Sequence, residues 1–311
     1  SAELGNGRMS EYQYYEFLAL DRPLTREQMS ELRAYSTRAR ITTTGFINEY
    51  HWGSFKGNVN AWMERYFDAF LYTASWGTNT LAFRLPGSLL DAKAASDYCP
   101  SEHAAVRTNN GNTILTFCSR VEDVHEVVSG DGLLATMVTV RAELLRGDLR
   151  ALYLAWLLSA QSGVLSDDDP EPPVPAGLNQ LSASLESMRE FLRIDVDLLA
   201  AGAAQSAPHK LEPLREGEVR QWIATLPVEE KDRLLTRMAM DDDGTLAIEV
   251  QRRYLDSRGT SASLAKKPSR TVGQLRASAK ALGEKRRREV AEREEQKRVQ
   301  QELEAQRSRQ A

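Results

Sequence analysis

The sequence contains little cysteine: two residues, Cys99 and Cys118, in a chain of 311. Two cysteines cannot build the disulfide framework that small secreted proteins use, and no secretory signal is recognisable near the start. We therefore expect a cytoplasmic protein. Ser1–Arg8 resembles an expression remnant in front of Met9, so we leave it out of the fold.

Long apolar runs are also missing. The most apolar stretch is Leu133–Gln161, and its last part, Leu149–Gln161, is shorter than the roughly 20 residues that a membrane-spanning helix needs. That part also contains Arg150. We expect no membrane segment.

Familiar catalytic signatures are absent as well. The sequence has no nucleophile elbow, no phosphate-binding loop and no dinucleotide fingerprint. Gly130-Asp131-Gly132 is too short to form a phosphate cradle. These absences favour a binding protein over an enzyme.

The charge is small overall but unevenly placed. The formal net charge is −4, yet the chain from Lys266 onward holds 14 Lys and Arg against 7 Asp and Glu. This tail therefore carries +7, which leaves −11 for the rest of the chain. An acidic body with a basic tail is the main electrostatic feature.

The apolar stretch in the middle of the chain predicts a strand followed by a buried helix. Leu134–Val140 alternates at period two with β-branched residues, which predicts a central strand. Asp148 is a suitable N-cap for a helix over Leu149–Gln161, whose apolar residues cover nearly the whole circumference. We expect this helix to join two layers of the core.

The beginning of the chain predicts strands around one helix. Tyr12–Leu20 is apolar on both faces and predicts an interior strand. Thr25 and Gln28 form a capping box for a helix that runs to about Arg38. Ile41–His51 predicts one strand, kinked near Gly45.

The same region carries a resemblance. The sequence EYQYYEFLALDRPLTREQMSELRAYSTRARITTTGFINEYHWGSFKG, over residues 11–57, resembles the opening of a group of uncharacterised bacterial proteins. The likeness extends through RGDLRALYLAWLL and PEPPVPAGL into the charged tail. It implies no activity, so no functional residue is carried over from it.

Together these patterns predict an α+β fold: a mixed or antiparallel N-terminal sheet with helices, then an all-α helical module and a long charged C-terminal helix. Asn109-Asn110-Gly111-Asn112 is a strong hairpin signal within the sheet. We expect the following division: 1–8 leader, 9–166 α+β domain with the buried helix 149–161, 167–177 proline-rich acidic connector, 178–258 helical module, 259–270 linker, and 271–311 charged helical arm.

The arm changes character along its length. Val272, Leu275, Ala279 and Leu282 follow heptad spacing, but charged residues such as Arg286 then occupy the same seam. Charged residues cannot be buried in series without partners. We expect the arm to dock on the body up to Leu282 and to project as a solvated helix over 284–311.

Candidate metal ligands are weak. Cys99, His103, Cys118 and His125 are the right types for a zinc site but lack paired spacing, and Cys118 falls in a predicted strand where it is better explained as a small core residue. The acidic runs Asp167–Asp169 and Asp241–Asp243 do not fit a calcium loop. We expect no metal and no cofactor.

Three further groups of residues are candidates for binding or chemistry. Glu49 and His51 share one face of a strand and could form an acid–base pair, although an ordinary surface hydrogen bond is the simpler interpretation. Large aromatic residues are common binding anchors, but they pack into cores more often. A candidate recognition surface is formed by Trp52, Phe55, Lys56, Trp62 and Tyr66, and a candidate phosphate contact by Lys285, Arg286, Arg287 and Arg288.

Our leading hypothesis is a non-enzymatic interaction or scaffold protein that binds another protein. The first alternative is a nucleic-acid-associated factor that uses the basic tail, although interleaved glutamates argue against a dedicated nucleic-acid surface. The second alternative is an unrecognised hydrolase or zinc protein. The sequence leaves the oligomeric state open.

Overall fold

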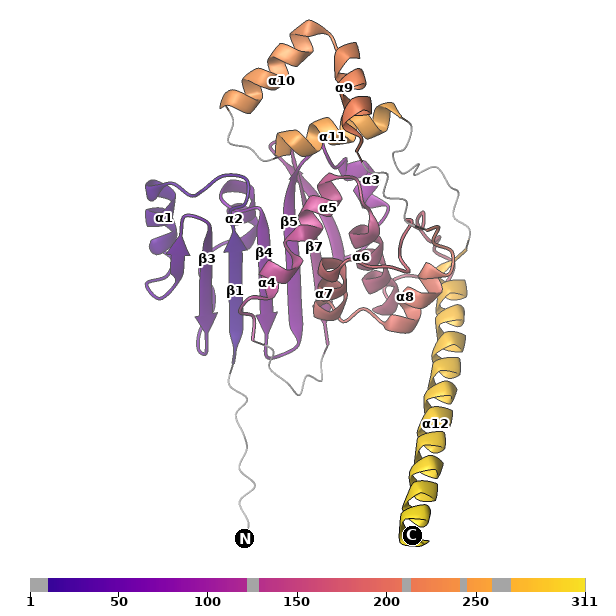
Figure 1. Cartoon of the computed structure of the whole chain (residues 1–311). Helices are drawn as coiled ribbons and strands as arrows, with labels where there is room; N and C mark the ends of the chain where they lie inside the picture. Colours follow the sequence, from indigo (N-terminus) through magenta and orange to yellow (C-terminus); the bar gives the residue numbers. More distant parts are fainter. Residues whose placement is uncertain (1–10, 122–128, 209–213, 241–244, 259–269, 311) are drawn as a thin grey trace.

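The computed structural model of the chain describes residues 11–121, 129–208, 214–240, 245–258 and 270–310, with side chains as far as Glu302 (Figure 1). Some of the predictions fall outside these residues. They are the leader 1–8, His125 in the acidic loop, Asp241–Asp243, and most of the linker 259–270.

The first part of the described chain forms a seven-stranded sheet in which all neighbouring strands are antiparallel. The strand order is β2-β3-β1-β4-β5-β7-β6. The predicted α+β class with an antiparallel sheet is confirmed. The strands are β1 (Gln13–Leu18), β2 (Arg40–Thr42), β3 (Gly45–Tyr50), β4 (Ala69–Ala74), β5 (Thr78–Pro86), β6 (Ala104–Asn109) and β7 (Asn112–Arg120).

Two predictions near the start of the chain are wrong in detail. Residues 41–51 do not form one kinked strand but belong to a hairpin, β2–β3. Gly45 is required there because a Cβ atom would lie 2.7 Å from the carbonyl oxygen of Phe17 on β1. The capping box of Thr25 and Gln28 is confirmed, but its helix ends at Arg33 rather than near Arg38.

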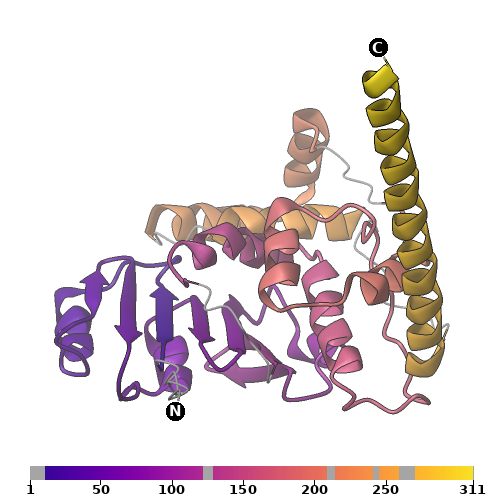
Figure 2. The same cartoon turned by 90° about the horizontal axis from the view of Figure 1, so that it is seen from below.

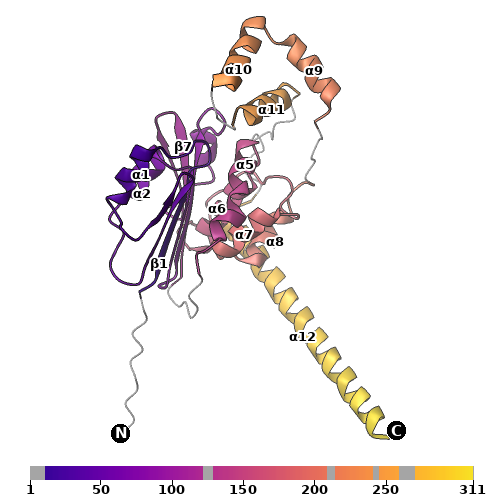
Figure 3. The same ribbon diagram turned by 60° about the vertical axis from the view of Figure 1, so that its left-hand side comes forward.

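Helices cover both faces of the sheet (Figure 3). The aromatic residues Phe17, Phe46 and Trp62 pack one core under α1 and α2, and a larger core lies between the other face and the helices that follow the sheet. The helices of the body are α1 (Arg26–Arg33), α2 (Val59–Arg65), α3 (Ala92–Ser96), α4 (Leu133–Met137), α5 (Thr139–Leu145), α6 (Arg150–Gln161), α7 (Ala183–Phe191) and α8 (Val196–Ala203).

The predicted central strand at Leu134–Val140 is wrong, because this segment forms α4 and α5. The apolar residues that alternate at period two also recur at helical spacing: Leu134, Met137, Val140 and Leu144 are all buried, whereas Thr136 and Thr139 are exposed. A short β-branched run satisfies both periods, so the packing of the two helices on the sheet decided the outcome.

Helix α6 lies at the centre of the larger core, as its apolar circumference predicted. Eleven of its twelve residues are buried, including Tyr153 and Trp156. The buried guanidinium of Arg150 is satisfied by the Asp148 carboxylate at 2.7 Å and by the carbonyl oxygen of Gln180 at 2.7 Å. The predicted N-cap is wrong by one residue: Leu149 occupies the N-cap position, and Asp148, one residue before it, accepts the backbone N–H of Arg150.

A short antiparallel clamp fixes the start of the last helix, α12 (Val272–Gln310). The backbone N–H of Glu171 donates to Arg270, and that of Val272 donates to Asp169. The buried carboxylate of Glu171 accepts hydrogen bonds from the Arg270 guanidinium and from the Tyr153 hydroxyl of α6. Burial raises the pKa of Tyr153, which keeps its hydroxyl a donor.

The predicted change of character along the arm is confirmed, but the buried apolar residues end at Ala279 rather than at Leu282. Val272, Leu275 and Ala279 are buried against the body, where α12 packs on α8, whereas Leu282 is 37% exposed. The side chains described from Glu284 to Glu302 are all exposed. Figures 1 and 2 show this part of α12 extending away from the other elements.

Asp68 is the centre of a buried polar network at the far end of β1. Its carboxylate accepts the backbone N–H groups of Leu20 and Asp21 and the side-chain N–H of Arg84. Burial alone would raise the pKa of this carboxyl. The guanidinium groups of Arg84 and Arg141, with the N–H of Asp21, outweigh burial and hold the pKa below its usual range.

We predict that Trp156→Ala lowers the free energy of unfolding by about 3–5 kcal/mol, because it removes a large aromatic side chain from a fully packed site. Chemical denaturation measures the change. Trp52→Ala is the matched control: Trp52 is 74% exposed, so its removal should cost less than about 0.5 kcal/mol. Equal losses in the two variants would contradict the assignment of α6 to the core.

We predict that Asp68→Asn destabilises the protein by about 3–5 kcal/mol at pH 7, because it leaves the largely buried guanidinium of Arg84 without its charged partner. The pKa of the Asp68 carboxyl is lower in the folded chain than in the unfolded chain, where an aspartate has a pKa of about 3.9, so the ionised carboxylate stabilises the fold above that pH. This stabilisation disappears as the pH falls through the folded-state pKa. The difference in free energy of unfolding between wild type and variant should therefore decrease below about pH 4. Glu102→Gln, at an exposed ion pair, is the control. A gap that stays constant from pH 7 to pH 3 would rule out this account.

We predict that removing residues 288–311 changes the free energy of unfolding by less than about 0.5 kcal/mol, because the side chains described there are exposed. Removing 271–311 should destabilise the protein strongly, since it also deletes Val272 and Leu275 from the core. Thermal unfolding of both truncations tests this. A marked loss of stability in the shorter truncation would mean that the arm is packed.

Candidate functional site

Three amphipathic helices after the body form a separate feature, which we call the α9–α11 unit. It consists of α9 (Glu216–Thr225), α10 (Val228–Met240) and α11 (Thr245–Ser257). Pro227 separates α9 from α10. Proline has no backbone N–H, but at the start of a helix that N–H would have no acceptor within the helix, so no hydrogen bond of the second helix is lost. Figure 1 shows α11 against the body and α9 and α10 extending beyond it.

The unit is attached through α11. Thr245, Leu246 and Tyr254 of α11 are buried, and α11 packs against α5. None of the side chains described in α9 and α10 is buried. These two helices therefore receive support on one side and leave much of their apolar surface uncovered.

Large exposed hydrophobic residues concentrate in this unit. Among the described residues, 16 large hydrophobic side chains are exposed, and six of them fall between residues 214 and 240. Leu235, Met238 and Met240 of α10 are 64, 72 and 79% exposed. The six are Leu214, Ile223, Val228, Leu235, Met238 and Met240. Exposed apolar surface at this density in the sequence favours an interaction site.

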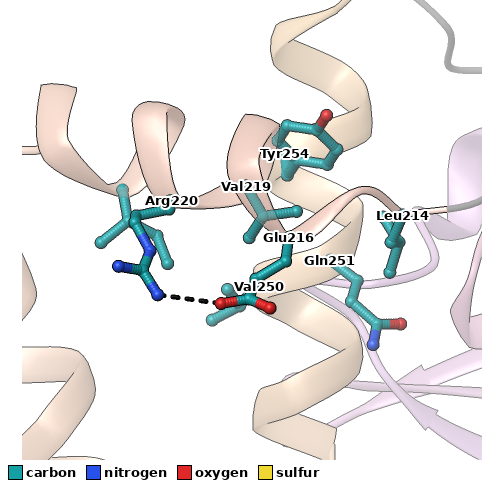
Figure 4. A pocket seen from close by; sticks show the side chains of 8 residues that line it. Leu214, Glu216, Val219, Arg220, Val250, Gln251 and Tyr254 are labelled. Carbon is teal, nitrogen blue, oxygen red and sulfur yellow. Dashed lines mark hydrogen bonds and ion pairs between the residues drawn. The ribbon is translucent and has the colours of Figure 1, made fainter.

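A groove of about 470 Å³ runs between α9 and α11 (Figure 4). Val219 and Ile223 of α9 and Val250 of α11 supply apolar surface. An ion pair between Glu216 and Arg220, at 2.8 Å, lies at the edge. The full lining is Leu214, Glu216, Val219, Arg220, Ile223, Val250, Gln251 and Tyr254.

Polar contacts hold the two walls of the groove together. The hydroxyl of Tyr254 on α11 donates to Glu218 of α9 at 3.1 Å, and Arg258 pairs with the same carboxylate. The hydrogen bond from Tyr254 and the charge of Arg258 lower the pKa of the Glu218 carboxyl. The rings of Trp222 and Tyr254 meet edge to face, with centroids 5.7 Å apart.

The chemistry of this groove suits binding rather than catalysis. Its lining combines aliphatic side chains with an ion pair whose two members neutralise each other. A catalytic site needs a nucleophile or an acid and a base held within hydrogen-bond reach. Among the lining residues, Glu216 and Arg220 satisfy each other, and the Tyr254 hydroxyl is engaged by Glu218.

The residues of the predicted recognition surface are divided between exposed positions and the core. Trp52 is 74% exposed and Lys56 is exposed, whereas Trp62 and Tyr66 are buried. Phe55 stacks on Tyr15, with ring centroids 4.7 Å apart. The five residues therefore do not share one exposed face, and their role in recognition stays a prediction.

The candidate metal ligands are not brought together in the described part of the chain. No three His, Cys, Asp or Glu side chains gather there in a way that could hold a metal ion. Burial raises the pKa of the Cys99 thiol to about 12, and Nδ1 of His103 lies 2.9 Å from the carbonyl oxygen of Cys118. Asp167 pairs with Arg276 of α12.

The other candidates lie on the surface. Glu49 and His51 are exposed at the end of β3, and the His51 ring contacts the ring of Tyr12. In the basic block, Lys285 pairs with Glu289 at 3.9 Å and Arg286 pairs with Asp197 of α8 at 2.8 Å. Two of the four proposed phosphate contacts therefore have acidic partners within the protein.

Sequence reasoning found α9, α10 and α11 but not the groove between α9 and α11. The segments Glu216–Thr225, Val228–Met240 and Thr245–Ser257 have helical patterns, and they were predicted to belong to a small helical bundle. Amphipathic spacing shows that a helix has an apolar side, but it does not show whether the same chain covers that side. The feature of the sequence that could have indicated the groove was the high density of apolar residues next to Pro227.

Comparisons of the chain with protein-family models, with curated proteins and with solved structures found no match. Across the described residues, no helix combines the length and the apolarity that crossing a membrane requires.

Proposed function

We propose that this chain is a non-enzymatic interaction protein, and that its α9–α11 unit binds an amphipathic helix of a partner protein. The observation that carries the proposal is that six of the 16 exposed large hydrophobic residues among the described ones fall between residues 214 and 240. Leaving Leu235, Met238 and Met240 in water gives up the favourable free energy of burial, about 25 cal/mol per Å² of apolar surface. A partner that covers them recovers it.

The shape of the groove supports a helix as the occupant. Two helices form its walls, its lining is aliphatic, and charged groups lie at its edge, which is the arrangement of helix-in-groove recognition. Helix α9 has ten residues and is therefore roughly 15 Å long. This length matches about three turns of a bound helix, which would present apolar residues at positions i, i+3 or i+4, and i+7.

The exposed methionines fit the same role. Met238 and Met240 carry unbranched, flexible side chains that adapt to different apolar surfaces. In this proposal the sheet and the helices α4 to α8 provide a rigid base, α11 connects that base to the binding surface, and α12 acts as a charged spacer.

The nucleic-acid alternative rests on the basic block of α12. Arg287 and Arg288 would be its main contacts, since Lys285 and Arg286 pair with Glu289 and Asp197. Affinity for nucleic acid comes mostly from the number of phosphates neutralised. Two arginines on one helix give a weak site, so we rank this function second.

We predict that Ile223→Glu and Leu235→Glu abolish capture of the partner without unfolding the protein. Both residues are exposed, at 39 and 64%, so each change should alter stability by less than about 0.5 kcal/mol. The test is purification from the native host with nuclease present, followed by mass spectrometry, and then titration of the identified partner in purified form. A buried unpaired carboxylate should weaken binding by at least tenfold, or about 1.4 kcal/mol.

Val290→Glu is the matched control, because Val290 is a 48% exposed apolar residue on the arm. It should retain the partner with unchanged affinity. A partner that binds both variants, the one in the groove at Ile223 and the one on α10 at Leu235, as tightly as wild type would refute the proposal. Loss of every partner on nuclease treatment would favour the nucleic-acid function. Self-association of the wild type that Leu235→Glu removes would show that a second copy is the occupant.

A further inference from the structure

A second groove lies on the other side of the molecule, on the face of the sheet that α1 and α2 cover. Helix α2 packs over β5. Beyond it, the side chains of β7 and β6 on the same face, such as Thr116 and Ala105, are partly exposed. The edge of α2 and the uncovered strands therefore enclose a recess, separate from the α9–α11 groove.

This recess, which we call the sheet groove, has a volume of about 400 Å³. Small-molecule sites typically measure about 300–1,000 Å³. Short side chains, including Ala82 and Thr116, form its base, and Val59 and Met63 of α2 form one wall. The full lining is Tyr15, Val59, Asn60, Met63, Phe70, Tyr72, Thr80, Ala82, Arg107, Ile114 and Thr116.

The two tyrosines at one end contribute their rings. The hydroxyls of Tyr15 and Tyr72 both donate to Oε1 of Gln13, at 2.9 and 3.3 Å. Because both hydroxyls already donate to Gln13, the surface that the two tyrosines add to the groove is mainly that of their aromatic rings. With Phe70, they make this end suitable for a flat apolar ring.

One cationic group lines the groove. Arg107 of β6 donates to Oδ1 of Asn60 at 2.8 Å and lies 3.6 Å from the carboxylate of Glu64. Its side chain is 39% exposed, so part of the guanidinium remains accessible. Because this distance is long, the ion pair with Glu64 is loose. The hydrogen bond to Asn60 restrains the guanidinium beside the groove. Arginine binds carboxylates well because its planar fork matches their two oxygens.

We infer that the sheet groove binds a small, flat, largely apolar molecule that carries one carboxylate. The ring system packs between the wall of α2 and the base formed by Ala82 and Thr116. The carboxylate meets Arg107, and Glu64 competes with it for the same guanidinium. Because the two carboxylates compete, removing the charge of Glu64 should strengthen binding of the ligand.

The test uses 2-naphthoate and its neutral analogue 2-naphthamide, titrated into the full chain by calorimetry or ligand-observed NMR. Wild type should bind the carboxylate about tenfold more tightly than the amide, the factor that a charge-assisted hydrogen bond supplies. Arg107→Gln should remove this preference. Glu64→Gln should tighten binding of 2-naphthoate and leave that of 2-naphthamide unchanged. Ala82→Leu, which fills the base, should abolish binding of both.

Arg65→Gln is the control, because Arg65 lies on the same helix and pairs with Glu31 on α1. It should leave both affinities unchanged. The gain expected for Glu64→Gln cannot result from unfolding, so it separates binding from stability. The inference is overturned if wild type binds neither compound below about 1 mM. It is equally overturned if Arg107→Gln and Glu64→Gln both leave the ratio of the two affinities unchanged.

Discussion

The complete burial of α6 is the constraint on which the rest of the structure depends. A helix with apolar side chains around its whole circumference must be surrounded, and one sheet face can cover only one side of it. Helices α7 and α8 and the first turns of α12 join the sheet in a single core with α6. The order of the helices after the sheet follows from this requirement.

Polar groups around α6 then determine where the chain enters and leaves this core. Arg150 at its start binds the carbonyl oxygen of Gln180. Tyr153 donates to Glu171, which also binds Arg270 just before α12. Buried charges are stable only when paired and hydrogen-bonded, so these contacts define one position for the connector and for the start of the arm. Gly202 of α8 is needed in the same region, because a Cβ atom there would lie 2.6 Å from the Tyr153 hydroxyl.

The α9–α11 unit is set apart because it takes little part in this core. Helix α11 packs on α5, whereas none of the side chains described in α9 and α10 is buried. In a body whose other helices are packed on several sides, such surface is best explained by a partner. The sheet groove differs in its lining: three aromatic residues, Tyr15, Phe70 and Tyr72, contribute to it, and its one arginine is held by Asn60.

Local signals in the sequence predicted much of the fold. The capping box at Thr25 and the hairpin at Asn110-Gly111 depend on neighbouring residues and are confirmed. The loss of packing along the arm is also confirmed, although it begins after Ala279 rather than after Leu282 as predicted. The segment Leu134–Val140 was misassigned because its apolar spacing fits both a strand and a helix, and tertiary packing chose the helix.

Neither groove could be predicted in this way, because their lining residues come from segments far apart in the sequence. Arg107 and Asn60 meet through the strand order, and Ile223 and Val250 through the return of α11 toward α9. Sequence patterns predicted many of the helices and strands, but not which of their faces would remain uncovered.

Hydrogen–deuterium exchange of the full chain, with and without the partner captured from the host, tests the central claim most directly. Our account predicts that partner binding slows amide exchange in α9, α10 and α11, while exchange in the exposed part of α12 is unchanged. Protection confined to α12, or to the strands of the sheet groove, with α9 and α10 unaffected, would contradict it.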